Sequence, residues 1–185
     1  MTTWLLAPLL LQASAMLIDE LYFHRQRGLP LWERVGHPLD TLSVLSCYVF
    51  ALAVTPTSAA LAGFVALAAF SCLLVTKDEL VHAQRCRPAE QWLHSLLFVL
   101  HPVVLGVAAL LWQRQERALL WCSAALTLGF GLHQALYWNV PWKKLLHRSS
   151  PSTTTSTTSS ASAGTAPTTI RSRSCGPNPA SEIHG

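Results

Sequence analysis

The sequence predicts an all-α integral membrane protein, built as a bundle of five transmembrane helices. Of its 185 residues, 51% are hydrophobic and 12% are charged, and the mean hydropathy is positive at +0.34. An average soluble domain has about twice that share of charged residues. The apolar residues also fall into long continuous blocks, which is typical of helices that cross a bilayer.

Five of these blocks are long enough to cross a hydrocarbon core, which takes about 20 helical residues. They cover residues 4–23, 38–54, 58–77, 91–112 and 118–138. Helices are favoured over strands because each block is continuous and a lipid-exposed backbone must satisfy its own hydrogen bonds. We therefore expect one transmembrane helical domain over residues 1–148.

The C-terminal segment, residues 149–185, has a different composition. Its stretch SSPSTTTSTTSSASAGTAPTT is rich in Ser and Thr and nearly devoid of apolar residues. Such a segment buries too little apolar surface to offset the entropy lost on ordering. We expect a disordered tail.

Basic residues indicate the orientation of the bundle. They gather between the first and second helices, between the third and fourth, and after the fifth: Arg25, Arg27, Arg34, Arg85, Arg87, Lys143, Lys144 and Arg148. The positive-inside rule then places the N-terminus outside and the C-terminus in the cytoplasm. We expect a multipass protein of a bacterial inner (plasma) membrane, in which these charges set orientation and no nucleic acid is bound.

Two stretches of the chain repeat one pattern of acidic and imidazole side chains. They are LIDELYFHRQRGLPLWERVGH at residues 17–37 and KDELVHAQRCRPAEQWLH at residues 77–94. Both contain Asp-Glu-Leu, a His shortly after, basic residues, a Pro, a Glu, and a His four residues beyond that Glu. In the expected topology every part of this internal two-helix repeat lies at the cytoplasmic side, so the two halves can share one site.

Helical geometry groups these residues further, because positions four or seven apart lie on nearly one face. The candidate metal ligands are the carboxylates and imidazoles that share such faces at the inner helix ends: Glu20, His24, Glu33, His37, Asp78, His82, Glu90, His94, His101 and His133. Glu33, His37, Glu90 and His94 are the expected core ligands. Charged residues at helix ends are ordinary, so any one of these residues alone favours a structural role, such as a solvated ion pair of Glu33 with Arg27 or Arg34.

Other residues are expected to support this site. Asp19, Asp40 and Glu79 are predicted to orient the ligating imidazoles. His101 and His133 lie inside their spans, where ionisable residues are costly and usually mark function. These two histidines and Tyr137 are the candidate catalytic residues, with Tyr137 donating a proton or an electron.

The ligand types restrict the metal. A mixture of imidazole and carboxylate without thiolate suits iron, manganese or zinc. The supply exceeds what one tetrahedral zinc ion would use. We therefore expect two metal ions, with iron favoured.

This pattern resembles the site of four-helix di-iron carboxylate proteins. Those proteins take a Glu from each of two helices, and a Glu with a His three residues later from each of the other two. Here the Glu-to-His spacing is mostly four and imidazoles are more numerous. The chain is also similar in character to histidine-rich membrane desaturases and hydroxylases, but their HxxxH and HxxHH boxes are absent. The resemblance covers residues 18–40 and 77–101 and implies a di-iron centre.

The leading functional hypothesis is an oxygen-dependent di-iron oxidoreductase that acts on a lipid-like substrate, such as an acyl chain, an isoprenoid or a quinone. Electrons would come from a cytosolic donor. One alternative is a zinc-dependent lipid hydrolase, in which the metal lowers the pKa of a bound water. Another is a non-catalytic transport or sensing site for a divalent metal or protons, and two facing histidines also suit haem.

Overall fold

The computed structural model of the chain describes residues 3–79 and 86–140, and within these ranges every regular element is a helix and none is a strand. Five helices are long and apolar enough to cross a membrane: Leu6–Arg27, Leu31–Ala53, Ser58–Val75, Pro88–Gln113 and Arg117–Asn139. The expectation of an all-helical chain of multipass composition is confirmed. The tail predicted at residues 149–185 lies outside the described residues.

The first helix is assembled from several pieces. A short 3-10 turn, η1 (Thr3–Leu5), leads into α1 (Leu6–Ile18), which continues through the π-helical segment η2 (Asp19–His24) into α2 (Arg25–Arg27). Gly28 then turns the chain with a φ of +73°, in the left-handed region that glycine adopts at little cost. This turn allows α3 to begin three residues later.

The remaining helices have recognisable start and stop signals. α3 (Leu31–Ala53) is followed by α4 (Ser58–Val75), whose first turn is capped by the Thr57 hydroxyl accepting from the backbone N–H of Ala60 at 3.1 Å. η3 (Thr76–Asp78) extends α4 by a 3-10 turn. α6 (Pro88–Gln113) opens with Pro88, where a proline costs no hydrogen bond, and α7 (Arg117–Asn139) follows a tight turn.

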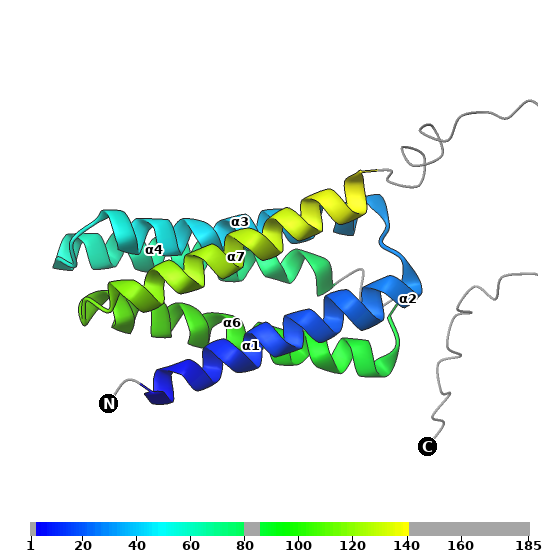
Figure 1. The fold of residues 1–185 in the computed structure, drawn as a ribbon, viewed down its shortest axis with the longest axis horizontal. Coiled ribbons are helices and arrows are strands. Elements are labelled where there is room, and N and C mark those ends of the chain that lie inside the picture. Colours follow the sequence, from blue (N-terminus) through cyan, green and yellow to red (C-terminus); the bar gives the residue numbers. More distant parts are fainter. Residues whose placement is uncertain (1–2, 80–85, 141–185) are drawn as a thin grey trace, which may run out of the picture. The chain divides into compact units, whose positions relative to one another are not determined.

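Successive helices run in alternating directions in the bundle (Figure 1). α3 packs most extensively against α7, α1 against α6, and α4 against α3 and α6. In this arrangement the ends of α2, α4 and α7 meet the starts of α3 and α6 at one end of the bundle. Both copies of the repeated pattern belong to these helix ends.

Two helix starts differ from the sequence-based expectation. α3 begins at Leu31 and not at residue 38, so Pro38 lies inside the helix, and α6 begins at Pro88 and not at residue 91. The sequence-based prediction placed both starts too late, because the charged first turns of these helices resemble loop sequence. The earlier starts put Glu33 and Glu90 inside the helices, where both are buried.

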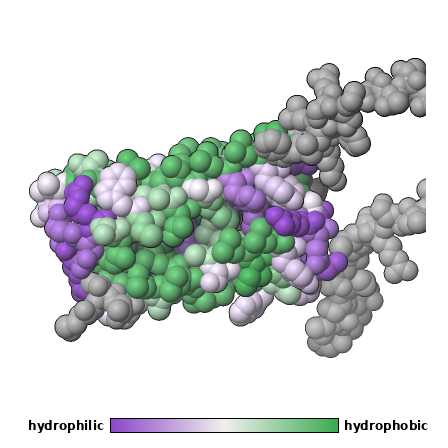
Figure 2. Space-filling model, in the orientation of Figure 1, coloured by the Kyte–Doolittle hydropathy of each residue, from purple (hydrophilic) through white to green (hydrophobic). Residues whose placement is uncertain are grey.

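The apolar core occupies the opposite half of the bundle. Phe64 stacks on Trp112 with ring centroids 5.6 Å apart, and the Trp112 indole donates to the carbonyl of Val54 at 2.7 Å. The outer surface seen in Figure 2 is a hydrophobic band between two hydrophilic ends. This distribution is the one that a bilayer-spanning bundle requires.

Candidate metal centre

The π-helical turn η2 determines which face of the first helix carries the acidic residues. Hydrogen bonds from residue i to residue i+5 widen this turn, so residues five apart lie close along the helix. Asp19 and His24, five apart, are in contact: Oδ2 of Asp19 lies 3.2 Å from Nε2 of His24. An α-helix would point these two side chains in clearly different directions.

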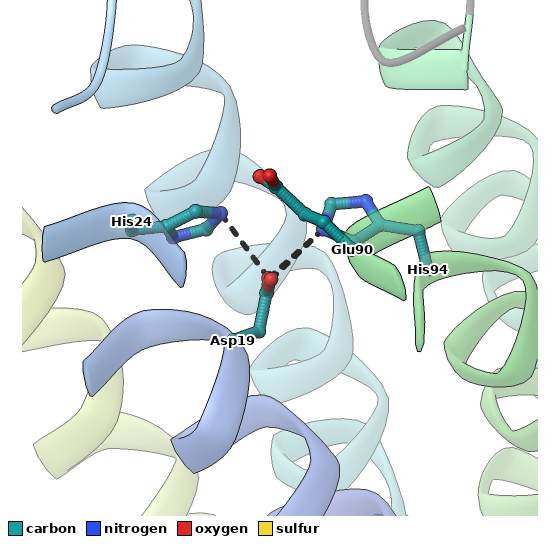
Figure 3. A group of neighbouring side chains, drawn as sticks. All are labelled: Asp19, His24, Glu90 and His94. Carbon is teal, nitrogen blue, oxygen red and sulfur yellow. Dashed lines mark hydrogen bonds and ion pairs between the residues drawn. The ribbon is translucent and has the colours of Figure 1, made fainter. Parts of the chain in front are cut away.

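Four buried side chains from η2 and α6 converge here, and Figure 3 shows Asp19 between two imidazoles. His94 Nε2 lies 3.0 Å from Oδ1 and 3.0 Å from Oδ2 of Asp19. Asp19, His24, Glu90 and His94 each offer one ligand atom, and these atoms lie within 4.8 Å of one another. Ligands around one cation at about 2.0–2.2 Å are at most about 4.4 Å apart, so a shift of a few tenths of an ångström would close the group around a metal.

His24 is held in an orientation that suits metal ligation. Its Nδ1 lies 3.3 Å from Oε2 of Glu20, while its Nε2 faces Asp19 without a hydrogen bond of acceptable angle among the described residues. A carboxylate on one ring nitrogen fixes the tautomer and presents the other nitrogen's lone pair to a metal. Glu20 is itself fixed by the Trp138 indole N–H and by Gln134 Nε2 at 3.5 Å.

A second group of possible ligands joins the first through His24. His24, Glu33 and His37 also offer atoms within 4.8 Å of one another, and the rings of His24 and His37 stack with centroids 4.8 Å apart. Glu33 and Glu90 are equivalent positions of the repeat, as are His37 and His94. The structure therefore brings both halves of the repeat around His24.

Arg27 connects the two repeat glutamates. Its guanidinium binds both oxygens of Glu33, at 2.6 and 3.0 Å, and donates to Oε1 of Glu90 at 3.1 Å. A cation at Glu33 would therefore compete with Arg27. Sequence reasoning considered this pair only as a solvated surface contact, but Glu33 is fully buried.

Among the described residues, buried carboxylates outnumber the cations in contact with them. Four carboxylates, those of Asp19, Glu20, Glu33 and Glu90, are each at most 6% exposed, and Arg27 is the guanidinium that contacts two of them. Buried charge is very costly unless it is balanced. Protonated histidines, residues outside the described ranges or bound metal would supply the balancing positive charge.

His101 and His133 lie near this cluster but belong to neither ligand group. His101 Nε2 is 2.9 Å from the Ser71 hydroxyl, which is 2.7 Å from the Ser43 hydroxyl. The His133 ring stacks on Tyr137, and its Nε2 lies 3.9 Å from Glu20. Tyr137 is partly exposed beneath the guanidinium of Arg25.

The residues expected to orient ligands have separate partners. Asp40 forms an ion pair with Lys77, with both oxygens 2.6 Å from Nζ, and Glu79 accepts from Gln91 at 3.0 Å. Of these three carboxylates, that of Asp19 contacts imidazoles of the cluster, those of His24 and His94. His82 lies outside the described residues, and so does the side chain of Asp78.

Sequence reasoning missed Trp138, Gln134 and the clamping role of Arg27. The signal for the first two was their place one turn apart near the inner end of α7, where polar groups of a membrane helix need partners.

Cys86 lies beside this region, and burial raises the pKa of its thiol to about 12, against a smaller opposing effect of Arg27.

A cavity of about 100 Å³ adjoins the cluster. Asp19, His24 and His94 contribute polar wall, and His101 also lines it. The rest of the wall combines polar residues with apolar ones such as Met16 and Phe130. The cluster thus faces a small chamber of mixed polarity.

Comparison with known proteins finds no relatives: no family model, no curated protein and no solved structure matches the chain.

Proposed function

We propose that this protein is a membrane-embedded metal enzyme, a dinuclear, iron-dependent oxidoreductase that acts on a lipid-like substrate. The observation that carries this proposal is the convergence of Asp19, His24, Glu90 and His94 within 4.8 Å, all four buried. Buried acid and imidazole clusters of this kind usually serve ligation or catalysis.

The excess of buried carboxylates over cations among the described residues supports metal occupancy. Each divalent cation would offset two of these negative charges. Two ions also fit the two overlapping ligand groups, the second of which contains Glu33 and His37. A metal ion can bind the second group only if the Arg27 guanidinium moves away from the Glu33 carboxylate.

Iron is favoured by the ligand chemistry and by the resemblance to di-iron carboxylate sites. Imidazole and carboxylate ligands suit iron, and when bound it would supply one-electron and O₂ chemistry. The chain's own residues would hold the site and orient its ligands, since Glu20 lies against Nδ1 of His24. His101, on its serine chain, is placed to hold or move a proton at its Nε2.

The proposed topology follows the basic connections. The cluster end carries Arg25, Arg27 and Arg34, so we place it at the cytoplasmic face of a bacterial inner membrane, with the N-terminus outside. There a cytosolic electron donor can reach the site. A lipid-like substrate can reach it laterally from the inner leaflet.

A mononuclear zinc enzyme is the second candidate, because the first group supplies four residues, whereas the second supplies three and shares His24 with the first. Asp19, His24, Glu90 and His94 match the number of ligands that a structural zinc uses, or three ligands and a general base. Such a site would favour hydrolysis of a lipid ester or amide.

Elemental analysis of the full-length protein, purified in detergent from cells grown in ordinary medium, separates the two candidates. The di-iron proposal predicts about two iron atoms per chain and near-ultraviolet absorption typical of oxo-bridged iron. About one zinc per chain without that absorption would replace it with the zinc candidate. A chain without stoichiometric metal, purified without chelator, would overturn both.

A further inference from the structure

A second cavity extends from the chamber toward the middle of the bundle. It has a volume of about 220 Å³ and is lined by α1 and α7, with α3 and α6 at its base; its walls include Leu9, Leu17, Tyr48, Val104 and Leu126. α1 and α7 are not among the helix pairs in extensive contact. The cavity is therefore a groove between these two helices.

The groove and the chamber adjoin each other. Both are lined by Gln12, Met16, Thr41, Val44 and Phe130. A molecule in the groove therefore lies next to the chamber that Asp19 and His24 line. The outer rim of the groove is apolar, since Leu17 is 49% exposed and Leu126 is 69% exposed, so it opens toward lipid.

The groove and the chamber together match the depth of one leaflet. Their lining on the first helix runs from Leu9 in the groove to Glu20 in the chamber, a distance of about 16.5 Å at 1.5 Å per residue. Half of a hydrocarbon core is about 15 Å. A lipid acyl chain that enters from the cluster end would fill this distance.

Gln12 adds a polar feature at the junction of the two cavities. The residue is 8% exposed, and its Oε1 has no hydrogen-bond partner among the described residues, while its Nε2 has only a 3.9 Å contact to the sulfur of Met16. A buried amide of this kind is costly in a membrane helix unless something binds it. Because Gln12 lines both cavities, its amide is placed to bind a ligand, either directly or through a water molecule.

We propose that the groove binds the acyl chain of a membrane lipid, with the polar end of that lipid at the Asp19–His24–His94 cluster. The groove names the substrate class of the proposed enzyme. The idea that the bound lipid reacts rests on the proposed function. Chain binding itself needs no metal.

The test uses the full-length protein in phosphatidylcholine nanodiscs with a fatty acid that carries a diazirine at mid-chain. After illumination, peptide mass spectrometry locates the label. We expect saturable labelling of the groove residues on α1 and α7, displaced by excess unlabelled fatty acid. Even labelling of lipid-facing residues such as Phe70 and Leu73, without displacement, would overturn the proposal.

Matched tryptophan variants test the assignment further. Leu17→Trp fills the groove, whereas Leu11→Trp changes a residue of equal exposure that does not line it. We expect Leu17→Trp to weaken saturable labelling by about tenfold or more, because overpacking excludes the chain, and Leu11→Trp to leave it unchanged. Leu126→Trp and Leu128→Trp repeat the comparison on α7, and equal labelling within both pairs would contradict the proposal.

Metal content measured on the same samples separates the two proposals. Stoichiometric metal without saturable labelling overturns the lipid groove and leaves the metal enzyme standing. Saturable labelling without metal overturns the metal enzyme and leaves the groove. Displacement by an isoprenoid alcohol but not by a fatty acid would overturn the acyl-chain assignment.

Discussion

Asp19 and Glu20 are adjacent in the sequence, but they occupy different places in the cluster. Asp19 faces the Nε2 atoms of His24 and His94, whereas Glu20 faces Nδ1 of His24 and is held by Trp138 and Gln134. From α-helical spacing, the sequence predicted Glu20 as a ligand and Asp19 as a supporting residue. We infer that Asp19 binds the metal and Glu20 orients its imidazole ligand.

Asp19→Asn and Glu20→Gln should therefore have unequal effects on metal affinity. Loss of an orienting carboxylate typically costs about 10–100-fold, so Glu20→Gln should fall in that range and Asp19→Asn should exceed it. The measurement is metal retained after dialysis against graded concentrations of chelator. A larger loss in Glu20→Gln than in Asp19→Asn would restore the original assignment.

His94 and His101 lie on the same helix, seven residues apart, and give a second comparison. His94→Ala removes a member of the four-residue group and should reduce metal affinity by more than about 100-fold. His101→Ala breaks only the contact with Ser71 and should retain metal. Elemental analysis of the purified variants checks both, and metal loss in His101→Ala would return that residue to the ligand set.

At the scale of elements, short segments bring the two halves of the repeat together. The π turn η2 turns Asp19 inward, the early starts of α3 and α6 bury Glu33 and Glu90, and α2 supplies Arg27 between them. A hydrophobicity pattern predicts the long apolar parts of each helix well. It does not predict these ends, because a π turn and a buried polar first turn depend on tertiary contacts that no local spacing encodes.

Arg27→Met tests the contribution of α2 to the fold. Removing one partner of a buried ion pair leaves uncompensated charge and typically costs about 3–5 kcal/mol. We expect a clear loss of thermal stability in chelator-treated protein, and a larger stabilisation by added metal than in the wild type.

The control for this variant is Arg34→Met. Arg34 is exposed, and its resolved side-chain hydrogen bond goes to the carbonyl of Leu29 at 2.7 Å, so we expect a loss of only about 1 kcal/mol. Thermal denaturation followed by circular dichroism measures both variants. Equal melting temperatures for Arg27→Met and the wild type would mean that Glu33 and Glu90 do not depend on the guanidinium.

At the scale of the whole molecule, polar chemistry and apolar packing occupy opposite halves of the bundle. The cluster lies where α2, α3, α6 and α7 meet, and the aromatic core around Trp112 lies toward the other end. The sequence alone predicted five helices and their common end, because continuous apolar runs and alternating direction determine both. Its orientation in the membrane stays a prediction, since it rests on charge distribution.

Cysteine accessibility checks this orientation. In a background without native cysteines, Gln26→Cys marks the cluster end and Thr55→Cys the connection between α3 and α4, and both positions are exposed. A membrane-impermeant maleimide added to intact cells should label Thr55→Cys alone. Labelling of Gln26→Cys alone would invert the topology and place the cluster outside.

The central claim is that the buried acid and imidazole cluster holds metal, and the most direct test is metal stoichiometry in the wild type beside His94→Ala. We expect about two metal ions per wild-type chain, and loss of most of that metal in His94→Ala with the helical content unchanged. Metal-free wild-type protein, or equal metal in both proteins, would contradict it.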